Sequence, residues 1–222
     1  MNQEPEKGEA LMADQAYARL IAALRDGRLA SGQFVSMPGL GELVELPLAA
    51  TREAVKRADV NGLVRVLPKR GVLVMEASSD VTRDCIDLRA MLDVEGARRL
   101  VRSGRALPLA ELRESHETLI EDALARMTPD LPRRAVVTDL TLHDALATGL
   151  SNPIAADVYA VNRDRIAVVQ NTRPFLPDRI VPAMQEHLAI IEALERRDAE
   201  AAVEAIGIHY RSTLRWWGIL EP

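Results

Sequence analysis

The chain has 222 residues, a formal net charge of −5 at pH 7 and 48% hydrophobic side chains, so it can bury one or two cores. Only 3% of its residues are aromatic, and its many Ala, Leu, Arg and Glu residues favour helices. No apolar run approaches the ~20 residues that a membrane span needs, the first ten residues are polar and acidic, and Cys85 is the single cysteine. We therefore expect a cytoplasmic protein without a membrane segment or an intrachain disulfide. The acidic charge excludes a protein that coats nucleic acid over its whole surface.

The first part of the chain, residues 10–76, predicts three helices and a β-hairpin. Apolar residues at helical spacing in DQAYARLIAALR, LGELVEL and LAATREAVKRADVNG predict the helices. In LVRVLPKRGVLVME, apolar residues alternate on both sides of a Pro-Lys-Arg-Gly turn, which is typical of a hairpin with a basic tip. This order is that of a winged helix-turn-helix, whose third helix enters the major groove of DNA while the hairpin reaches an adjacent groove or phosphate. Basic residues on a helix are common on any solvated face, so the ordered combination carries the prediction.

The second part, residues 80–222, is predicted to be wholly helical. Helices are expected over about 80–103, 108–127, 131–149, 153–171, 177–196 and 199–217. Because their connections are short, neighbouring helices are expected to run antiparallel. The predicted fold class is therefore mainly α, with an N-terminal winged helix-turn-helix and a C-terminal antiparallel six-helix bundle, joined by the polar segment 77–80.

Four ionisable residues of the second part occupy helical positions that point inward. Asp139 and His143 are four residues apart and share one helix face, and His187 and His209 lie among apolar neighbours on the fifth and sixth bundle helices. Three imidazoles and a carboxylate suit a divalent cation, zinc in the first place, with nickel, manganese or iron as alternatives. A single inward histidine is more often a hydrogen-bonded core residue, but burying four such groups without a shared partner is costly. His116, which has charged neighbours, is expected at the surface.

Several motifs resemble those of a known family of bacterial regulators. TREAV, NGLV and KRGVLV resemble the DNA-binding domain of GntR-type transcription regulators. DLRAMLDVEGARRLV and TDLTLHDALATGLSNP resemble the FCD effector domain of their FadR subfamily, and six effector helices resemble the shorter, VanR-like form. The resemblance covers about residues 14–217. It implies the same four metal ligands, because metal-binding FCD domains use an Asp-x3-His pair and two later histidines.

For DNA binding, the resemblance implies six contact residues, namely Thr51, Arg52, Lys56, Lys69, Arg70 and Gly71. Gly71 is expected to let the hairpin turn close against the phosphate backbone. Family members usually carry Ser-Arg shortly before the REA segment, where the arginine helps to read DNA. This chain has Pro47-Leu48 there, so that contact is absent and we expect an altered sequence preference.

These observations predict a homodimeric, ligand-responsive transcription regulator, a repressor rather than an activator, and not an enzyme. Its partners would be double-stranded operator DNA, pseudo-palindromic in sequence, and a small carboxylate-bearing metabolite that changes operator affinity. Arg89 is a candidate to pair with that carboxylate, although a salt bridge is nearly as good an interpretation, and Asn171 is a weaker pocket candidate.

Two other classes stay open on the sequence. One is a metal-dependent hydrolase, which needs a general base close to the metal. Asp144 and Glu186 are next to predicted ligands in the sequence, but they project roughly 100° away from them around their helices, so neither is an evident general base. The other is an effector-independent DNA-binding protein with a structural metal.

Overall fold

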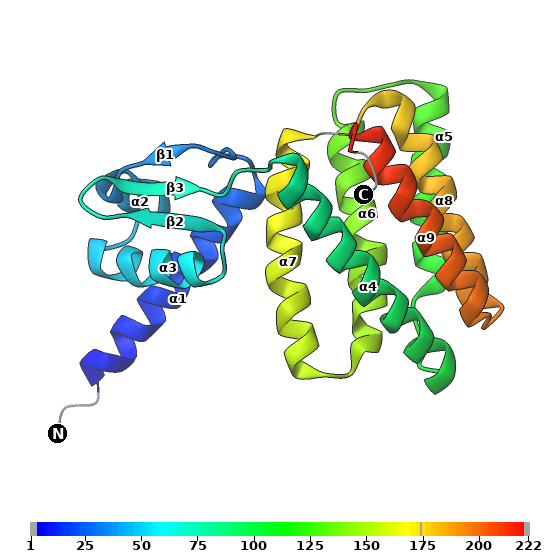
Figure 1. The fold of residues 1–222 in the computed structure, drawn as a ribbon, viewed down its shortest axis with the longest axis horizontal. Coiled ribbons are helices and arrows are strands. Elements are labelled where there is room, and N and C mark those ends of the chain that lie inside the picture. Colours follow the sequence, from blue (N-terminus) through cyan, green and yellow to red (C-terminus); the bar gives the residue numbers. More distant parts are fainter. Residues whose placement is uncertain (1–3, 174, 220–222) are drawn as a thin grey trace. The chain divides into compact units, whose positions relative to one another are not determined.

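The computed structural model describes residues 4–173 and 175–219, in which helices dominate and three short strands lie near the N-terminal end (Figure 1). The chain divides into two compact units. The first ends at Val81 and also includes Asp164–Thr172, and the second comprises Thr82–Arg163 and the chain from Arg173 onward. The predicted fold class is confirmed. Residues 220–222 of the predicted second domain lie outside the described residues.

The first unit has three helices and a small antiparallel sheet. Its elements are α1 (Glu4–Arg25), β1 (Phe34–Val35), α2 (Met37–Val44), α3 (Leu48–Val60), β2 (Val64–Leu67) and β3 (Gly71–Val74). The strand order is β1-β3-β2, with Val66 opposite Val72 and Phe34 opposite Leu73. Leu20, Leu40 and Val55, one from each helix, are buried in one core with the inward residues of β3. This is the winged helix-turn-helix that the alternation and helical periodicity predict.

A segment far along the chain completes that core. Val168 of α7 (Pro153–Thr172) is buried in the same apolar cluster as α1 and α3. Asp164 forms an ion pair of 2.5 Å with Arg25, and Arg165 donates to the carbonyl of Asn61 at 2.7 Å. The predicted limits of the first domain therefore miss Asp164–Thr172. Helical periodicity shows that one face is buried, but it does not show against which element.

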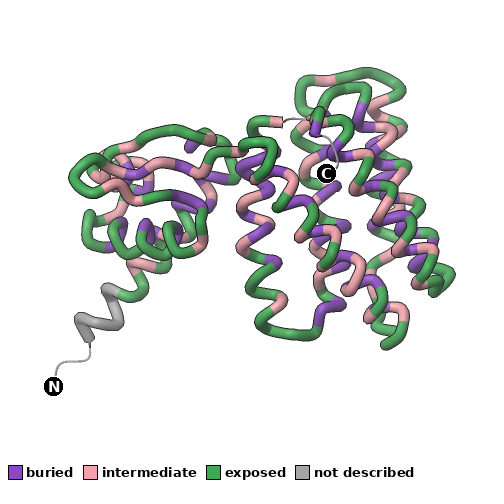
Figure 2. The backbone as a smooth tube through the Cα atoms, viewed as in Figure 1, coloured by how far each residue is buried: buried purple, intermediate pink, exposed green. Residues whose placement is uncertain are grey.

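The second unit is the helical bundle. Besides the N-terminal part of α7, it contains α4 (Ser79–Ser103) from Thr82 onward, α5 (Leu109–Ala125), α6 (Leu131–Ala147), a 3-10 turn (Thr148–Leu150), α8 (Pro177–Glu195) and α9 (Ala199–Trp216). Helix α8 packs against α5, α6 and α9. Buried and exposed residues alternate along these helices, as expected of helices that bury one face (Figure 2). Within the described residues, every helix is too short or too polar to cross a lipid bilayer.

Two glycines bring α4 close to the end of α6. A Cβ atom on Gly96 would lie 2.3 Å from the carbonyl oxygen of Leu146, and one on Gly149 would lie 2.3 Å from the carbonyl oxygen of Gly96. Both distances are far shorter than any tolerated contact. The backbone of α4 therefore touches the end of α6 and the 3-10 turn after it, which holds Arg89 and Asp93 on the buried face of α4 beside α6.

Candidate metal centre and DNA-binding residues

The four predicted metal ligands come together inside the bundle. Asp139 and His143 lie on α6, His187 on α8 and His209 on α9, and all four are buried. One ligand atom from each residue lies within 4.8 Å of every other. Asp139 Oδ1 is 3.5 Å from His187 Nε2 and 3.7 Å from His143 Nε2, and the Nε2 atoms of His187 and His209 are 3.2 Å apart. Three helices thus bring one carboxylate oxygen and three imidazole nitrogens to one place.

The other ring nitrogen of each histidine is held by a partner. Nδ1 of His143 donates to Asp93 Oδ2 at 2.7 Å, and Nδ1 of His209 donates to Glu186 Oε2 at 2.8 Å. Nδ1 of His187 lies 3.1 Å from Nε2 of His116. A neutral imidazole that carries its proton on Nδ1 has a lone pair on Nε2. This is the arrangement of metal-binding histidines, whose second nitrogen is oriented by an outer hydrogen bond.

This arrangement fits a cation better than it fits an empty core. Nε2 of His143 is buried and has no hydrogen-bond partner within the described residues. The lone pairs on Nε2 of His187 and His209 face each other at 3.2 Å, which is repulsive unless a cation or a proton lies between them. The donor set of three imidazoles and one carboxylate suits zinc and related divalent metals.

Burial and nearby charge favour the metal-binding protonation states of three ligands. Burial lowers the pKa of His187 well below its usual 6.5, and the neighbouring His209 lowers it further. Burial also lowers the pKa of His209, to about 4, against the opposing hydrogen bond to Glu186. For Asp139, burial raises the pKa, but Arg89 and His143 outweigh burial and bring the pKa well below 3.8. These groups are therefore neutral imidazoles and a carboxylate at pH 7, the forms that bind metal.

His143 differs from the other two histidines. Burial and Arg89 lower its pKa, but the carboxylates of Asp93 and Asp139 outweigh them, so its pKa is raised above 6.5. A proton therefore competes with a cation at His143 more than at His187 or His209.

The two predicted effector residues lie in different units. Arg89 of α4 is buried beside the cluster, and its Nη1 donates to Asp139 Oδ2 at 3.3 Å. A small cavity lined by Arg89, Asp93 and His209, among others, has a volume of about 10 Å³, which is room for one water molecule. Asn171 belongs to the first unit, where its amide donates to the carbonyl of Leu24 at 2.8 Å. The structure thus brings Arg89, but not Asn171, into the bundle that holds the cluster.

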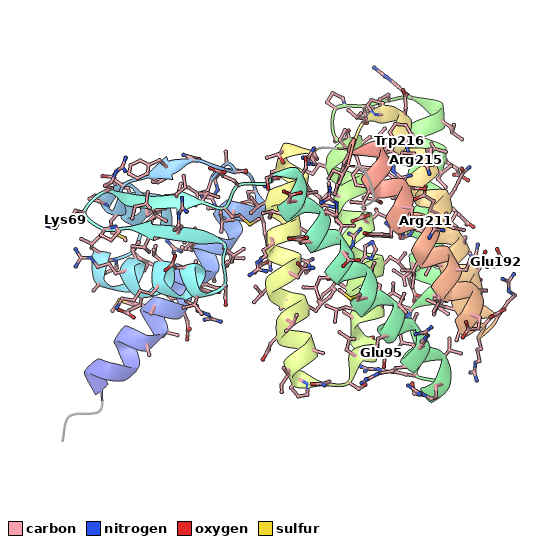
Figure 3. The ribbon with its side chains drawn as sticks, in the orientation of Figure 1. Lys69, Glu95, Glu192, Arg211, Arg215 and Trp216 are labelled. Atoms are coloured by element: carbon pink, nitrogen blue, oxygen red, sulfur yellow. The ribbon has the colours of Figure 1, made fainter. Side chains whose placement is uncertain are left out.

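Four of the six predicted DNA contacts are exposed. Arg52 and Lys56 lie on the outer face of α3, and Lys56 forms a surface ion pair of 2.7 Å with Glu53. Lys69 and Arg70 are exposed at the turn between β2 and β3, and Figure 3 shows Lys69 at the tip of this hairpin. All four side chains are accessible from solvent, as a contact with a phosphate or a base edge requires.

The other two residues have internal roles instead. Thr51 is 1% exposed, and its hydroxyl donates to the carbonyls of Leu46 and Pro47, at 3.4 and 3.2 Å, so it stabilises the start of α3 and is not presented to DNA. Gly71 has a φ of 143°, and a Cβ there would lie 2.6 Å from the carbonyl oxygen of Val35. Glycine is required at this position because β1 packs closely against β3. This close packing explains the glycine by itself, without the expected approach of Gly71 to a phosphate.

The prediction for His116 is wrong, because this histidine is fully buried on α5 and contacts His187. His116 has charged neighbours in the sequence, which suggested a surface position. Its helical spacing indicates burial, because His116 lies four residues after Leu112 and three before Leu119, and these three residues form the buried stripe of α5. Glu186 and Asp93 were also missed as partners of the cluster. Glu186 reaches His209 across the α8–α9 contact, and Arg179 pairs with both of its oxygens at 2.6 Å.

Comparisons with known proteins agree with this architecture. The family model of the FCD domain matches residues 84–212. The HTH-type transcriptional regulator BphR of Paraburkholderia xenovorans is 26% identical over 220 residues, covering 95% of this chain and 88% of BphR. The HTH-type transcriptional repressor NanR of Citrobacter rodentium is 31% identical over 88 residues, covering 37% of this chain and 33% of NanR.

Solved structures of regulators share the fold. A GntR transcriptional regulator from Rhodococcus sp. RHA1 superposes with a TM-score of 0.75 at 18% identity, covering 94% of this chain and 99% of that one. McbR/YncC of E. coli superposes with a TM-score of 0.70 at 17% identity, covering 93% and 97%. With a family model that spans more than half of its length and a winged helix-turn-helix before it, the chain belongs to the FCD-domain family, as a transcription regulator of the GntR type.

Proposed function

We propose that this regulator binds a divalent metal, zinc in the first place, through Asp139, His143, His187 and His209, and that it binds operator DNA as a homodimer in response to a small carboxylate. The observation that carries the metal proposal is the convergence of three buried Nε2 lone pairs on one carboxylate oxygen. When bound, the metal would supply open coordination positions for an effector oxygen or a water molecule.

The charges of the buried groups support an anionic effector. Among the described residues, five charged side chains are linked to the cluster by the hydrogen bonds given above: the carboxylates Asp93, Asp139 and Glu186, and the guanidinium groups Arg89 and Arg179. Together they carry one net negative charge, so a divalent cation leaves one net positive charge in a buried place. A single carboxylate group brings the site to neutrality, which lowers the cost of burying the charges. Arg89 would receive that carboxylate, because its guanidinium group lies beside the cluster, where Nη1 donates to Asp139.

The exposed basic residues of the first unit support binding to operator DNA. Arg52 and Lys56 lie on the helix that enters the major groove in this fold, and Lys69 and Arg70 lie at the wing tip. In a dimer, two such units would read two half-sites, which predicts a pseudo-palindromic operator. NanR is named a repressor, and repression is the mode that we propose here.

Two measurements test the proposal together. Elemental mass spectrometry on the purified protein should find about one divalent metal per chain, and a panel of small carboxylates should shift operator binding of the metal-loaded protein but not of the chelator-treated protein. A protein that binds no divalent metal would overturn the metal part. Operator binding that no member of the panel changes would favour a structural metal, and hydrolysis of a small ester by the metal-loaded protein would favour an enzyme.

A further inference from the structure

His116 of α5 stands directly behind one of the proposed metal ligands. Its side chain is completely buried, and its ring meets that of His187 on α8 edge to face, with ring centroids 5.2 Å apart and an interplanar angle of 68°. His116 is neither one of the four proposed metal ligands nor one of the charged groups around them. A buried histidine that contacts another buried histidine needs a reason, because two imidazoles can form a hydrogen bond only when their protons are placed correctly.

The hydrogen bonds of His116 run in one direction. The carbonyl oxygen of Leu112, 2.6 Å from Nδ1 of His116, can only accept, so that nitrogen carries the proton. A metal bound at Nε2 of His187 requires the proton of His187 to sit on Nδ1. That proton then points at Nε2 of His116, 3.1 Å away, where the remaining lone pair accepts it. The chain from Leu112 through His116 to His187 is therefore satisfied at every atom when His187 binds a metal through Nε2.

We propose that His116 is a positioning residue of the metal centre, which holds His187 in the tautomer that exposes Nε2 to the cation. This inference rests on the proposed metal function. His143 and His209 are held in the same way by carboxylates, Asp93 and Glu186. His116 performs the same orientation without adding a negative charge, so one of the three ligand histidines has a neutral outer partner. The ring plane of His187 is fixed at the same time, because the hydrogen bond and the edge-to-face contact restrict its rotation.

A packing role for His116 predicts different consequences from a positioning role. His116→Leu fills the same space in the core with an apolar side chain of similar size, but it removes the nitrogen that accepts a hydrogen bond from His187. His116→Gln keeps a polar oxygen or amide group at the distance of Nε2, so it can still accept the proton of His187. Leu119→Ala is the matched packing control, because Leu119 is buried on the same helix and belongs to the apolar cluster of Leu131 and Ile180.

The test measures zinc affinity of the full chain by competition with a chelator. We expect His116→Leu to weaken zinc binding about 10- to 100-fold, the usual effect of losing an outer partner of a metal ligand, and His116→Gln to restore most of the affinity. Leu119→Ala should lower thermal stability without a comparable loss of zinc affinity. Equal zinc affinity in His116→Leu and the wild type, or an equal loss in Leu119→Ala, would overturn the positioning role.

A measurement on the unmodified protein keeps the proposal testable if a variant does not fold. In long-range ¹H–¹⁵N spectra of the zinc-loaded protein, His187 should carry its proton on Nδ1 and bind zinc through Nε2. A zinc bond at Nδ1 would overturn the inference while leaving the metal site in place. Failure of the wild type to bind zinc or any other divalent metal would instead overturn the metal part of the proposed function, and this inference with it.

Discussion

Asp139 uses its two carboxylate oxygens for different contacts: one accepts a hydrogen bond from Arg89, and the other faces the histidines of the cluster. Oδ2 accepts a hydrogen bond from Arg89 Nη1 at 3.3 Å, and Oδ1 lies among the imidazoles, 3.5 Å from His187 Nε2. Both side chains are about 96% buried or more. The guanidinium keeps Asp139 ionised in the bundle core, and it also turns one oxygen toward the proposed cation. The arginine from α4 is thus linked to the metal centre through a ligand of α6.

The first prediction concerns the carboxylate ligand. Asp139→Asn removes the negative charge at the cation, and we expect zinc affinity to fall by at least the ~10–100-fold that follows loss of an outer partner. Asp144→Asn is the matched control, because Asp144 lies on the same helix but bonds to Arg163 and Tyr159, at 2.6 and 2.8 Å. Chelator competition measures both affinities. Similar zinc affinities in the two variants would remove Asp139 from the ligand set.

The second prediction concerns DNA binding. Arg52→Ala and Lys69→Ala should each weaken operator binding, and loss of a phosphate contact should reduce the slope of log K against log salt by ~0.9 per contact. Arg57→Ala is the control, since Arg57 lies on the same helix but stacks over the ring of Tyr17 at 3.9 Å. Binding isotherms at several salt concentrations give the slopes. If Arg57→Ala changes operator affinity as much as Arg52→Ala, net charge rather than position explains the effect.

The third prediction compares two helical glycines of the bundle. Gly96→Ala should lower the free energy of unfolding by several kcal/mol, of the order of other severe core disruptions, because the new Cβ would lie 2.3 Å from the carbonyl oxygen of Leu146. Gly207→Ala in α9 should raise it by up to ~1 kcal/mol, because its Cβ meets only the flexible end of Arg211 at 3.3 Å. Urea unfolding of both variants measures the difference. A Gly96→Ala protein as stable as the wild type would show that α4 is free to move away from α6.

The fourth prediction concerns pH and the metal-free protein. The pKa of His209 is about 4 in the folded chain against 6.5 ordinarily, so between these values the unfolded chain binds a proton that the folded chain does not. The free energy of unfolding should therefore decrease as the pH falls from about 6.5 towards about 4. His187, whose pKa is also lowered, acts in the same direction. His143 acts in the opposite sense. Its pKa is raised in the folded chain, so its contribution to the free energy of unfolding is lost as the pH rises through that pKa.

Urea unfolding in the presence of a chelator, repeated across this pH range, checks the prediction. His209→Gln has no proton to take up at this position, so it should show a weaker dependence on pH than the wild type. A free energy of unfolding that stays constant from pH 6.5 down to about 4 would contradict the burial of neutral imidazoles in the bundle.

The elements and the inward-facing positions of the four clustered residues could be predicted from local patterns. An α-helix repeats every 3.6 residues, so the spacing of Asp139 and His143 places both on one face before any fold is known. The alternation around Lys69 and Arg70 likewise predicts the hairpin and its basic tip. Strong periodicity and turn residues are properties of neighbouring residues, which explains why these predictions needed no tertiary information.

Contacts between distant segments were decided only by the tertiary structure. His116 and Glu186 are partners of His187 and His209 because α5, α8 and α9 pack together, and no local pattern states which helix faces which. Sequence periodicity also could not show that Asp164–Thr172 belongs to the first unit, because the same pattern is typical of any packed helix. Only the structure shows that Val168 of this segment is buried in the core of the first unit. Thr51 matched a DNA-binding motif by position, yet the fold buries it. Sequence spacing determines which side of an element is apolar or charged, whereas packing determines what that side meets.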